Sequence, residues 1–339
     1  MSTILADVCE PEPVCPDRKR GKDKPCVRYI PPDDSMDVGL CSKPDKFLCI
    51  ESLKHKCPRL SYSQADTFSR CRYMYYLRYV QGIRVKPTQQ SGSIKMGTLW
   101  DKACNEYDGT LTIDQALAES LRIDPFDLAK VNALARAANE LGIDVTVDPI
   151  TGDKFAPQYE ITKHLESVRI LAYLDGITDD RACFVERKCS ARPDRYLDIH
   201  NLNGQIATYF MMVPESDRCV MQIVRVSSLR KGSDSPEDFE ERIVDDILNR
   251  PKYYFQGYMG NNTFGISFTR QEFDIDAERI RYQAIGNDIK GCAARNEWYR
   301  NRNACVQYGT NYPCDYLPIC DRSGKNETIY VYADKKIDG

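Results

Sequence analysis

Short stretches built around apolar residues lie in the central part of the chain. These stretches are strand candidates, and they lie near residues 155–175, at 182–190 and at 219–229. Short apolar runs are typical of strands, in which successive side chains point to opposite faces. A last candidate, TIYVYAD at 328–334, follows a loop that carries several cysteines. The pattern therefore predicts a set of strands, most of them in the middle of the chain.

Apolar residues recur at helical spacing in the segments around these strands. The segment SYSQADTFSRCRYMYYLRYVQGI at 61–83 is predicted to form one helix, with Ser63 and Asp66 as its capping pair and Gly82 at its end. A second helix is predicted to begin near Gly97. Further helical patterns lie at 113–141 (with two breaks), 203–213, 237–250 and 273–292. This order predicts a mixed α/β fold, in which helices flank a central sheet.

The composition is that of a globular protein with no overall basic character. The 339 residues are 42% hydrophobic and 29% charged, and the formal net charge is −3. No apolar run approaches the length that a bilayer-spanning helix needs, so we expect no membrane partner. The first residues show no basic start followed by an apolar stretch, so no secretory signal is visible and we expect an intracellular, cytoplasmic protein.

One segment combines basic and aromatic residues in a way that allows two interpretations. Arg70, Arg72, Arg78 and Arg84 form a basic cluster there, and a second cluster, DRKRGKDK, lies at 17–24. Such clusters are either solvated surface or contacts for nucleic acid. The tyrosines of the same segment either stack on the bases of a single strand or, more commonly, pack in a core. They are Tyr73, Tyr75, Tyr76 and Tyr79.

Fifteen cysteines are unusual for a chain with no visible secretory signal. In a reducing compartment disulfides rarely persist, so the cysteines indicate metal or cluster ligation, or buried thiols. Residues 1–58 lack periodicity, so they need a metal ion or a neighbouring surface to fold. We predict a cysteine-rich, zinc-binding appendage there. Its candidate ligands are Cys15, Cys26, Cys41 and Cys49, with Cys9, Cys57 and His55 as competitors.

A group of charged residues lies on and beside the strand candidate at 182–190. Glu186 and Lys188 are two apart, so they project from the same face, and Asp175 arrives from the preceding segment. Carboxylates on a rigid frame hold Mg2+ or Mn2+, and a neighbouring lysine can orient water or stabilise negative charge. The alternative is a surface ion pair. Gln205 and Tyr209 follow on one face of a helix.

These motifs, in this order, resemble the PD-(D/E)XK nuclease superfamily, and specifically its RecB-like exonuclease branch. The resemblance implies a restriction-endonuclease-like core over residues 59–339, in which Asp175 and Glu186 bind the metal and Lys188 completes the site. It also implies that the Gln205–Tyr209 helix contacts DNA or supports the site. In the helix near Gly97 the branch usually has a histidine ligand where this chain has Asp101. Aspartate can ligate Mg2+ or Mn2+ through oxygen, with an altered metal preference.

Four other cysteines resemble the arrangement by which iron–sulfur members of this branch hold a [4Fe-4S] cluster. They are Cys71, Cys305, Cys314 and Cys320, and Cys292 is a reserve ligand. Four thiolates suit either an iron–sulfur cluster or zinc, and spacing alone does not choose between them. Buried free thiols are the remaining alternative. The resemblance implies a structural cluster that joins the helix at Cys71 to the loop near the C-terminus.

The combined features predict an enzyme, a Mg2+- or Mn2+-dependent DNA exonuclease of phage or prokaryotic recombination or repair. DNA ends or single strands are the expected partner, and no protein partner is predicted. The alternative is a non-catalytic nucleic-acid-binding protein on a nuclease fold. Asp101 in place of histidine favours the alternative, whereas the intact Asp175, Glu186 and Lys188 set favours the enzyme.

Overall fold

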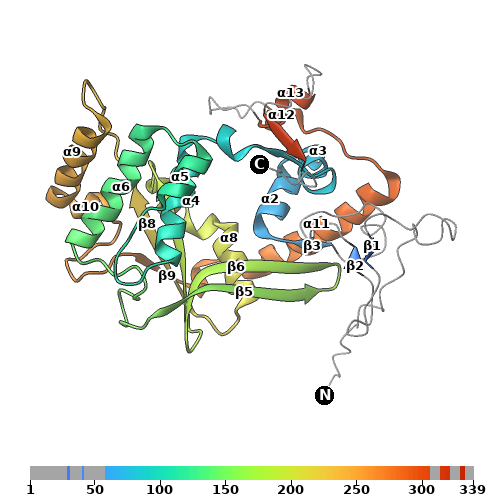
Figure 1. The fold of residues 1–339 in the computed structure, drawn as a ribbon. Coiled ribbons are helices and arrows are strands. Elements are labelled where there is room, and N and C mark those ends of the chain that lie inside the picture. Colours follow the sequence, from blue (N-terminus) through green and yellow to red (C-terminus); the bar gives the residue numbers. More distant parts are fainter. Residues whose placement is uncertain (1–28, 31–39, 42–57, 306–313, 321–328, 333–339) are drawn as a thin grey trace. The chain divides into compact units, whose positions relative to one another are not determined.

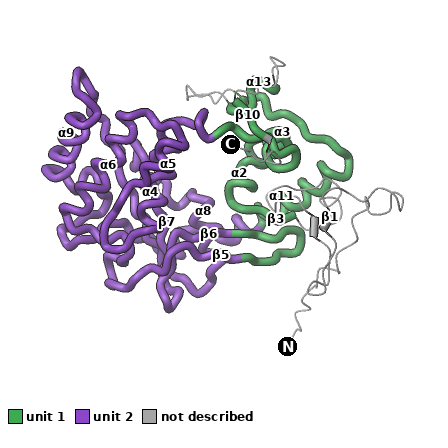
Figure 2. The backbone as a smooth tube through the Cα atoms, in the orientation of Figure 1, with its two compact units in different colours: residues 1–86, 162–171, 280–339 green, residues 87–161, 172–279 purple. Residues whose placement is uncertain are grey.

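The computed structural model describes most of the chain and divides it into two compact units. The described residues are 29–30, 40–41, 58–305, 314–320 and 329–332. Unit 1 comprises Met1–Lys86, Thr162–Leu171 and Ile280–Gly339, and unit 2 comprises Pro87–Ile161 and Ala172–Arg279 (Figure 2). The predicted boundary between an appendage at 1–58 and a nuclease domain at 59–339 stays a prediction, because residues 42–57 lie outside the described ranges.

A six-stranded mixed sheet forms the centre of the fold (Figure 1). Its strands are β3 (Arg59–Leu60), β5 (Phe155–Leu165), β6 (Val168–Thr178), β7 (Cys183–Ser190), β8 (Arg218–Arg225) and β9 (Ile266–Thr269). The order is β3-β6-β7-β8-β9, and β5 also pairs with β6. The pairs β3–β6 and β7–β8 are parallel, whereas β6–β7 and β8–β9 are antiparallel. The predicted mixed α/β class with a central sheet is confirmed.

The helices of unit 2 lie on both faces of the sheet. They are α4 (Gly92–Asn105), α5 (Gln115–Leu121), α6 (Pro125–Glu140), α7 (Asp194–Leu197), α8 (Gly204–Met212), α9 (Pro236–Asn249) and α10 (Pro251–Tyr254), with short 3-10 turns η3 (Pro87–Gln89), η4 (His200–Leu202) and η5 (Arg270–Glu272). One buried apolar cluster joins α4, α5, α6 and α9 to the end of β8. On the other face, Phe184 of β7 packs edge-to-face on Tyr209 and Phe210 of α8. The second predicted helix, α4, begins at Gly92 rather than near Gly97.

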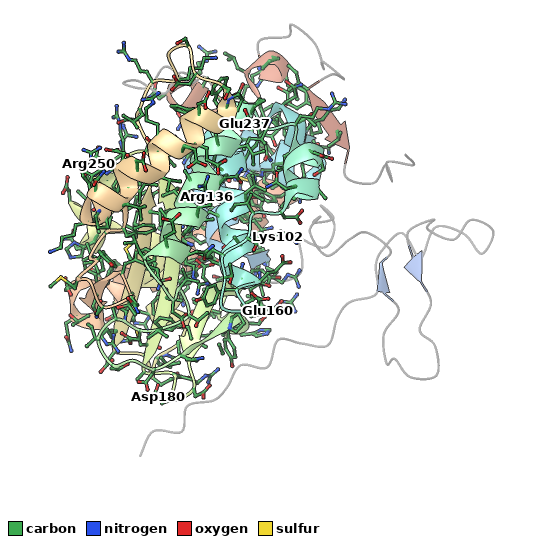
Figure 3. All side chains as sticks on the ribbon, turned by 60° about the vertical axis from the view of Figure 1, so that its left-hand side comes forward. Lys102, Arg136, Glu160, Asp180, Glu237 and Arg250 are labelled. Carbon is green, nitrogen blue, oxygen red and sulfur yellow. The ribbon has the colours of Figure 1, made fainter. Side chains whose placement is uncertain are left out.

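Local sequence signals set the ends of these helices. Asp124 caps α6 by accepting hydrogen bonds from the backbone of the first turn, and Pro125 occupies the first helical position. Asn203 and Ser235 cap α8 and α9 in the same way. Each such cap stabilises a helix by about 1 kcal/mol. On the surface, Arg136 of α6 (Figure 3) pairs with Glu240 and Glu241 of α9 at 2.8 Å.

The helices of unit 1 differ from the prediction of one continuous helix over 61–83. Helix α2 (Tyr62–Arg70) is capped by Ser61 and Gln64, not by Ser63 and Asp66. The helical path breaks at Cys71, whose φ of −159° and ψ of 115° are extended. It resumes as α3 (Arg72–Tyr75) and a π-helical turn, η2 (Tyr76–Val80), before Gly82 ends it with a φ of +72°. A conformation that favours glycine therefore stands where the sequence predicts the end.

The rest of unit 1 consists of short strands and the C-terminal helices. These elements are β1 (Tyr29–Ile30), β2 (Leu40–Cys41), β4 (Ile83–Val85), α12 (Arg302–Cys305), α13 (Leu317–Cys320) and β10 (Tyr330–Tyr332). The last predicted strand, β10, pairs with β4 rather than with the central sheet. Helix α11 (Ile275–Arg295) starts in unit 2 and continues into unit 1. A Cβ on its Gly286 would lie 2.8 Å from the backbone oxygen of Ser167, so only glycine fits there.

No helix within the described ranges has the length and apolar character that crossing a membrane requires. The tyrosines of the basic segment divide into two kinds. Tyr75 and Tyr79 are buried, whereas Tyr73 and Tyr76 are half-buried. The half-buried pair packs against the buried apolar cluster that contains Leu77 and Ile83, so all four tyrosines contribute to core packing.

Candidate active site

The candidate site lies where strands β6 and β7 part. Their register pairs Ile177 with Phe184 and Gly176 with Val185. The next step along that register brings Asp175 opposite Glu186. There the Asp175 carboxylate accepts a hydrogen bond from the backbone N–H of Arg187 (2.7 Å). A side chain therefore satisfies a strand N–H at this point, and this fixes the orientation of the carboxylate.

Four of the predicted residues lie along one continuous set of contacts, and with Asp175 on the neighbouring strand we call them the carboxylate–lysine group. The group comprises Asp175, Glu186, Lys188, Gln205 and Tyr209. The ammonium of Lys188 pairs with Oε1 of Glu186 and donates a hydrogen bond to the side-chain oxygen of Gln205 (3.2 Å). The amide of Gln205 in turn donates to the hydroxyl of Tyr209 (2.8 Å). The four-residue spacing on α8 thus produces the shared face that the sequence predicts.

Burial gives Glu186 an unusual electrostatic character. The residue is only 2% exposed, and its second oxygen, Oε2, is buried with no hydrogen-bond partner among the described residues. Burial raises the pKa of Glu186 to about 7, against the lowering effect of Lys188 and with the added repulsion of Asp175 and Asp101. Burial lowers the pKa of Lys188, but the carboxylate of Glu186 outweighs it, so the net shift is upward. The lysine therefore stays charged at neutral pH.

Asp101 reaches this region from helix α4. Burial raises the pKa of Asp101, and the charge of Asp175 raises it further, so the two carboxylates lie within electrostatic reach of each other. The Asp101 side chain is hydrogen-bonded to Asn105, one turn further along α4. Asp101 also lines an open hollow of about 490 Å³ in unit 2, together with residues of α4, α5 and β5.

Arg187 is a buried residue of this site that the sequence analysis missed. It stands between Glu186 and Lys188, so its side chain turns to the opposite face of β7, towards α4. Its guanidinium donates hydrogen bonds to oxygens of Asp175 (2.9 Å), Val145 (3.1 Å), Gln222 (3.2 Å) and Asn105 (3.4 Å). A charged residue at a core-facing strand position needs such partners, and that position was the available signal.

The described side chains do not form a closed metal cage. Among the residues that the structure describes, no three Cys, His, Asp or Glu side chains lie close enough together to hold one metal ion. The three predicted ligands, Asp101, Asp175 and Glu186, influence one another electrostatically. Their assignment as ligands stays a prediction.

The four cysteines predicted to hold a cluster lie in one part of unit 1, and we call them the cysteine group. Cys71 stands at the break between α2 and α3, and its sulfur accepts a hydrogen bond from the backbone N–H of Asn301 (3.4 Å). The N–H of Cys314 donates to the backbone oxygen of Cys305 (3.0 Å). Burial raises the pKa of Cys320 to about 11, and the charges of the other three thiolates add to this effect. The sulfurs of Cys71, Cys305 and Cys314 therefore lie within electrostatic reach of the Cys320 sulfur.

The remaining cysteine predictions have different outcomes. Cys15, Cys26 and Cys49 lie outside the described residues, and of Cys41 only the backbone, in β2, is described. The reserve ligand Cys292 is buried, and the charges that most affect its pKa belong to Arg72, Asp288 and Arg295. Its surroundings therefore differ from those of the cysteine group.

Comparison with known proteins gives one family. A search of curated proteins found no match for this chain. A family model described as the PD-(D/E)XK nuclease superfamily matches residues 59–321, which is most of the sequence. The matched range includes the carboxylate–lysine group, Asp101 and the cysteine group. The chain belongs to the PD-(D/E)XK nuclease superfamily.

Proposed function

We propose that this protein is a Mg2+- or Mn2+-dependent DNA exonuclease of the RecB-like branch. The observation that carries the proposal is the state of Glu186. One of its oxygens pairs with Lys188, and the other is buried without a partner among the described residues. An unsatisfied buried oxygen costs about 1–3 kcal/mol, so this oxygen supports a ligand role for Glu186 over a purely structural ion pair. A bound divalent cation would satisfy it.

The donors fit a hard cation, because Asp101, Asp175 and Glu186 offer carboxylate oxygens. When bound, such a cation lowers the pKa of a water and neutralises charge on a phosphodiester. Arg187 holds Asp175 in place through its backbone N–H. Gln205 accepts a hydrogen bond from Lys188 and so orients the ammonium towards the carboxylates. Lys188 is then positioned to stabilise negative charge on the phosphate oxygens.

Exonuclease action on DNA, and a role in phage or prokaryotic recombination or repair, are supported by the ordered motifs. Asp175, Glu186, Lys188 and the Gln205–Tyr209 pair follow one another as in the RecB-like branch. The hydrogen bonds from Lys188 through Gln205 to Tyr209 add to that resemblance, because they give the helix motif a contact with the lysine. The Asp101 substitution leaves an oxygen donor where the branch has an imidazole.

We also propose that the cysteine group holds a [4Fe-4S] cluster. A backbone N–H donates to the Cys71 sulfur, and such bonds stabilise a thiolate that ligates iron. The charges of the other three thiolates act on Cys320, which supports a single site for all four sulfurs. Four thiolates suit either such a cluster or zinc, and the resemblance to the iron–sulfur members of the branch favours the cluster.

For residues 1–58 we propose a zinc-binding appendage with Cys15, Cys26, Cys41 and Cys49 as ligands. The support is compositional, because a segment rich in proline, aspartate and cysteine cannot bury a core of its own. Zinc analysis of the whole protein, beside a variant with Cys26 and Cys49 replaced by serine, tests this assignment. We expect the variant to lose one zinc per chain.

The test of the enzyme is cleavage by anaerobically purified protein of end-labelled single- and double-stranded DNA, with Mg2+, Mn2+ or EDTA. We expect the label to be released as short products from linear DNA, and covalently closed circular DNA of the same sequence to stay intact. Cutting of the circle would show an endonuclease instead. Binding of DNA without cleavage under any metal would favour the alternative, a non-catalytic binding protein.

A further inference from the structure

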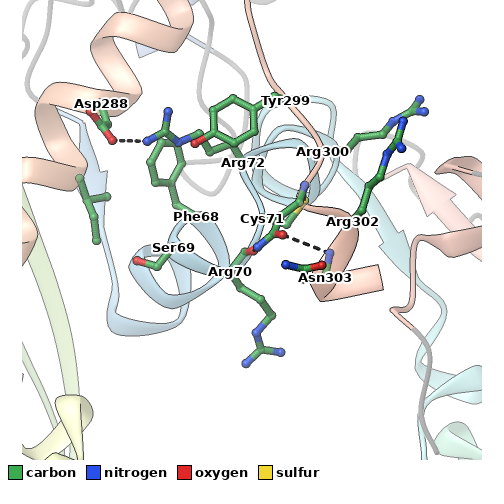
Figure 4. Close-up of a pocket in the computed structure, with 12 residues that line it drawn as sticks. Phe68, Ser69, Arg70, Cys71, Arg72, Asp288, Tyr299, Arg300, Arg302 and Asn303 are labelled. Carbon is green, nitrogen blue, oxygen red and sulfur yellow. Dashed lines mark hydrogen bonds and ion pairs between the residues drawn. The ribbon is translucent and has the colours of Figure 1, made fainter. Parts of the chain in front are cut away.

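A hollow in unit 1 is surrounded by positive charge, although the chain as a whole is slightly acidic. The hollow has a volume of about 350 Å³ and lies between the end of α2 and the segment that follows α11. Four arginines and one acidic residue line it (Figure 4): Arg70, Arg72, Arg300, Arg302 and Asp288. We call it the arginine pocket. A local excess of guanidinium groups in a protein of net charge −3 attracts an anion.

The four arginines have different roles. The Arg72 guanidinium pairs with Asp288 and lies over the rings of Tyr299 (4.6 Å) and Phe68 (5.3 Å), as Figure 4 shows. Its charge is therefore neutralised, and it forms part of the wall. Arg70 pairs with Asp66 at 3.0 Å, but both side chains are well exposed, so water weakens that pair.

Arg300 and Arg302 keep their charge. Arg300 donates to the backbone oxygen of Cys320 (3.2 Å) and lies over the ring of Tyr73. A hydrogen bond with Tyr73, together with the thiolate charges of Cys320 and Cys305, raises the pKa of Arg300 and so keeps it charged. Arg302 is exposed, and it makes no hydrogen bond or ion pair with the described residues. Both side chains extend to the same side in Figure 4. Two charged guanidinium groups two residues apart suit the spaced negative charges of a phosphodiester chain.

The segment that carries these arginines is held in place. The side-chain amide of Asn301 donates to the backbone oxygen of Arg70 (2.9 Å), and its backbone N–H donates to the sulfur of Cys71 (3.4 Å). Arg300 and Arg302 flank Asn301, so the same contacts fix their positions relative to α2. A site that is ordered before binding loses less entropy when its ligand arrives.

Aromatic rings beside the pocket favour an unpaired strand. Tyr299 is 58% exposed at the rim, and Tyr73 is half-buried beneath Arg300. Unpaired bases can stack on such rings, whereas the bases of a duplex are already stacked on each other. We propose that the arginine pocket binds the backbone of single-stranded DNA, with Arg300 and Arg302 contacting phosphates and Tyr299 stacking on a base. This inference rests on the proposed function, because it assigns the strand that the nuclease engages.

The test measures binding apart from cleavage. The anisotropy of a fluorescent 20-nucleotide single strand is followed in EDTA, over a range of salt concentrations, with the full chain and its Arg302→Ala and Arg302→Glu variants. Arg302 is exposed and makes no hydrogen bond or ion pair with the described residues, so we expect both variants to fold, and their melting temperatures check this. Each lost phosphate contact reduces the salt slope of single-strand binding by about 0.7. We expect about fivefold weaker binding for alanine and a larger loss for glutamate, independent of sequence.

The matched controls separate charge from stacking. Arg250→Ala removes an exposed arginine that pairs with Asp246 in unit 2 (Figure 3), and it should leave affinity and slope unchanged. Tyr299→Leu should weaken single-strand binding with little change of slope, and affect duplex binding less. Wild-type affinity and slope in both Arg302 variants would overturn the inference, even if the protein cleaves DNA. If the protein never cleaves DNA but the Arg302 variants bind single strands more weakly, the arginine pocket is a DNA-binding site and the proposed nuclease activity is wrong.

Discussion

The carboxylate–lysine group of unit 2 and the cysteine group of unit 1 are assembled from the chain in opposite ways. The first comes from two neighbouring strands and the helix that follows, within residues 175–209. The second joins Cys71 to residues 305–320, which are more than 230 positions away. The side-chain repeat of a strand and that of a helix are enough to bring the residues of the first group onto shared faces. The second group comes together only when distant parts of the chain fold against each other.

This difference predicts different consequences for stability. Unit 2 builds its site on paired strands and a buried apolar cluster, so the frame is present without a metal. Near the cysteine group, one buried apolar cluster of the described residues contains Leu77, Ile83, Tyr316 and Tyr330, and Tyr75 is buried close to Cys71. A ligated group that joins distant segments adds to the stability that such packing provides. The carboxylate–lysine group is therefore expected to affect the reaction, and the cysteine group the fold.

The largest expected effect is the loss of cleavage in Glu186→Ala and in Lys188→Ala. Each change removes one partner of the buried pair and one element of the proposed metal and phosphate chemistry. We expect DNA cleavage to fall at least about a thousandfold, which corresponds to about 4 kcal/mol of transition-state stabilisation. Single-turnover cleavage of end-labelled DNA measures it, and anisotropy in EDTA should show that DNA binding remains.

Lys130→Ala is the matched control, because Lys130 forms an ion pair with Asp127 on the surface of the same unit. It should cleave at the wild-type rate. Asp175→Asn should behave like the alanine variants, since an amide oxygen binds Mg2+ poorly beside a carboxylate. Normal cleavage by purified Glu186→Ala or Lys188→Ala would remove both residues from the active site.

The next effect concerns stability, and Cys71→Ser measures it. A cluster that joins Cys71 to Cys305 closes a loop of more than 200 residues, and such a closure is worth up to about 5 kcal/mol by the chain-entropy argument. Ligand exchange in the unfolded chain reduces that figure, so we expect a loss of about 3 kcal/mol. Thermal unfolding and the absorbance near 400 nm of anaerobic protein should both fall.

Cys219→Ala is the control for that experiment. Cys219 is fully buried in β8, and burial raises its pKa well above the ordinary value. The Cys219→Ala protein should therefore keep its iron and its colour. If wild-type protein contains neither iron nor zinc, and Cys71→Ser melts at the wild-type temperature, the cysteine group closes no loop.

The two groups also show what a sequence can and cannot predict. The faces of Glu186, Lys188, Gln205 and Tyr209 follow from local periods, and the structure places these side chains in contact. The role of Arg187 was missed, because its partners come from α4, from β6 and β8, and from the turn at Val145. No local pattern reports such partners.

Errors at element ends have a similar cause. Apolar residues keep their helical spacing on both sides of Cys71, so the sequence pattern does not reveal the helix break. The break appears only in the extended backbone of Cys71. The helix cap is Ser61 and not the predicted Ser63, because Gln64 completes a capping box with Ser61. Both serines precede a polar residue by three positions, so the sequence alone does not distinguish them. The last strand was found, but its partner β4 depends on tertiary contacts.

We expect the affinity for Mg2+ to change about tenfold with pH. The pKa of Glu186 is about 7 without a metal, and only the ionised carboxylate binds a cation. Protons therefore compete with Mg2+ below pH 7, so affinity should rise about tenfold from pH 6 to pH 8 and then level off. The same raised pKa means that the metal-free protein loses stability as pH rises through 7. Calorimetric Mg2+ titrations at several pH values measure the first effect, and Glu186→Gln should abolish it.

The smallest expected effect is a change of metal preference on substitution of Asp101, the one predicted ligand that comes from a helix rather than from the strands. Asp101 lies within electrostatic reach of Asp175, so removing its charge should weaken Mg2+ binding and cleavage. Asp101→His exchanges an oxygen donor for the nitrogen that the RecB-like branch uses, and nitrogen donors favour Mn2+ over Mg2+. We expect the Mn2+:Mg2+ ratio of cleavage rates to rise about fivefold in Asp101→His. Glu106→Gln is the control, since it removes a carboxylate that lines the same hollow but pairs with Lys102, and it should leave the ratio unchanged. If Asp101→Ala cleaves like wild type with both metals, the strands alone hold the cation, and Asp101 is a helix carboxylate with no part in the site.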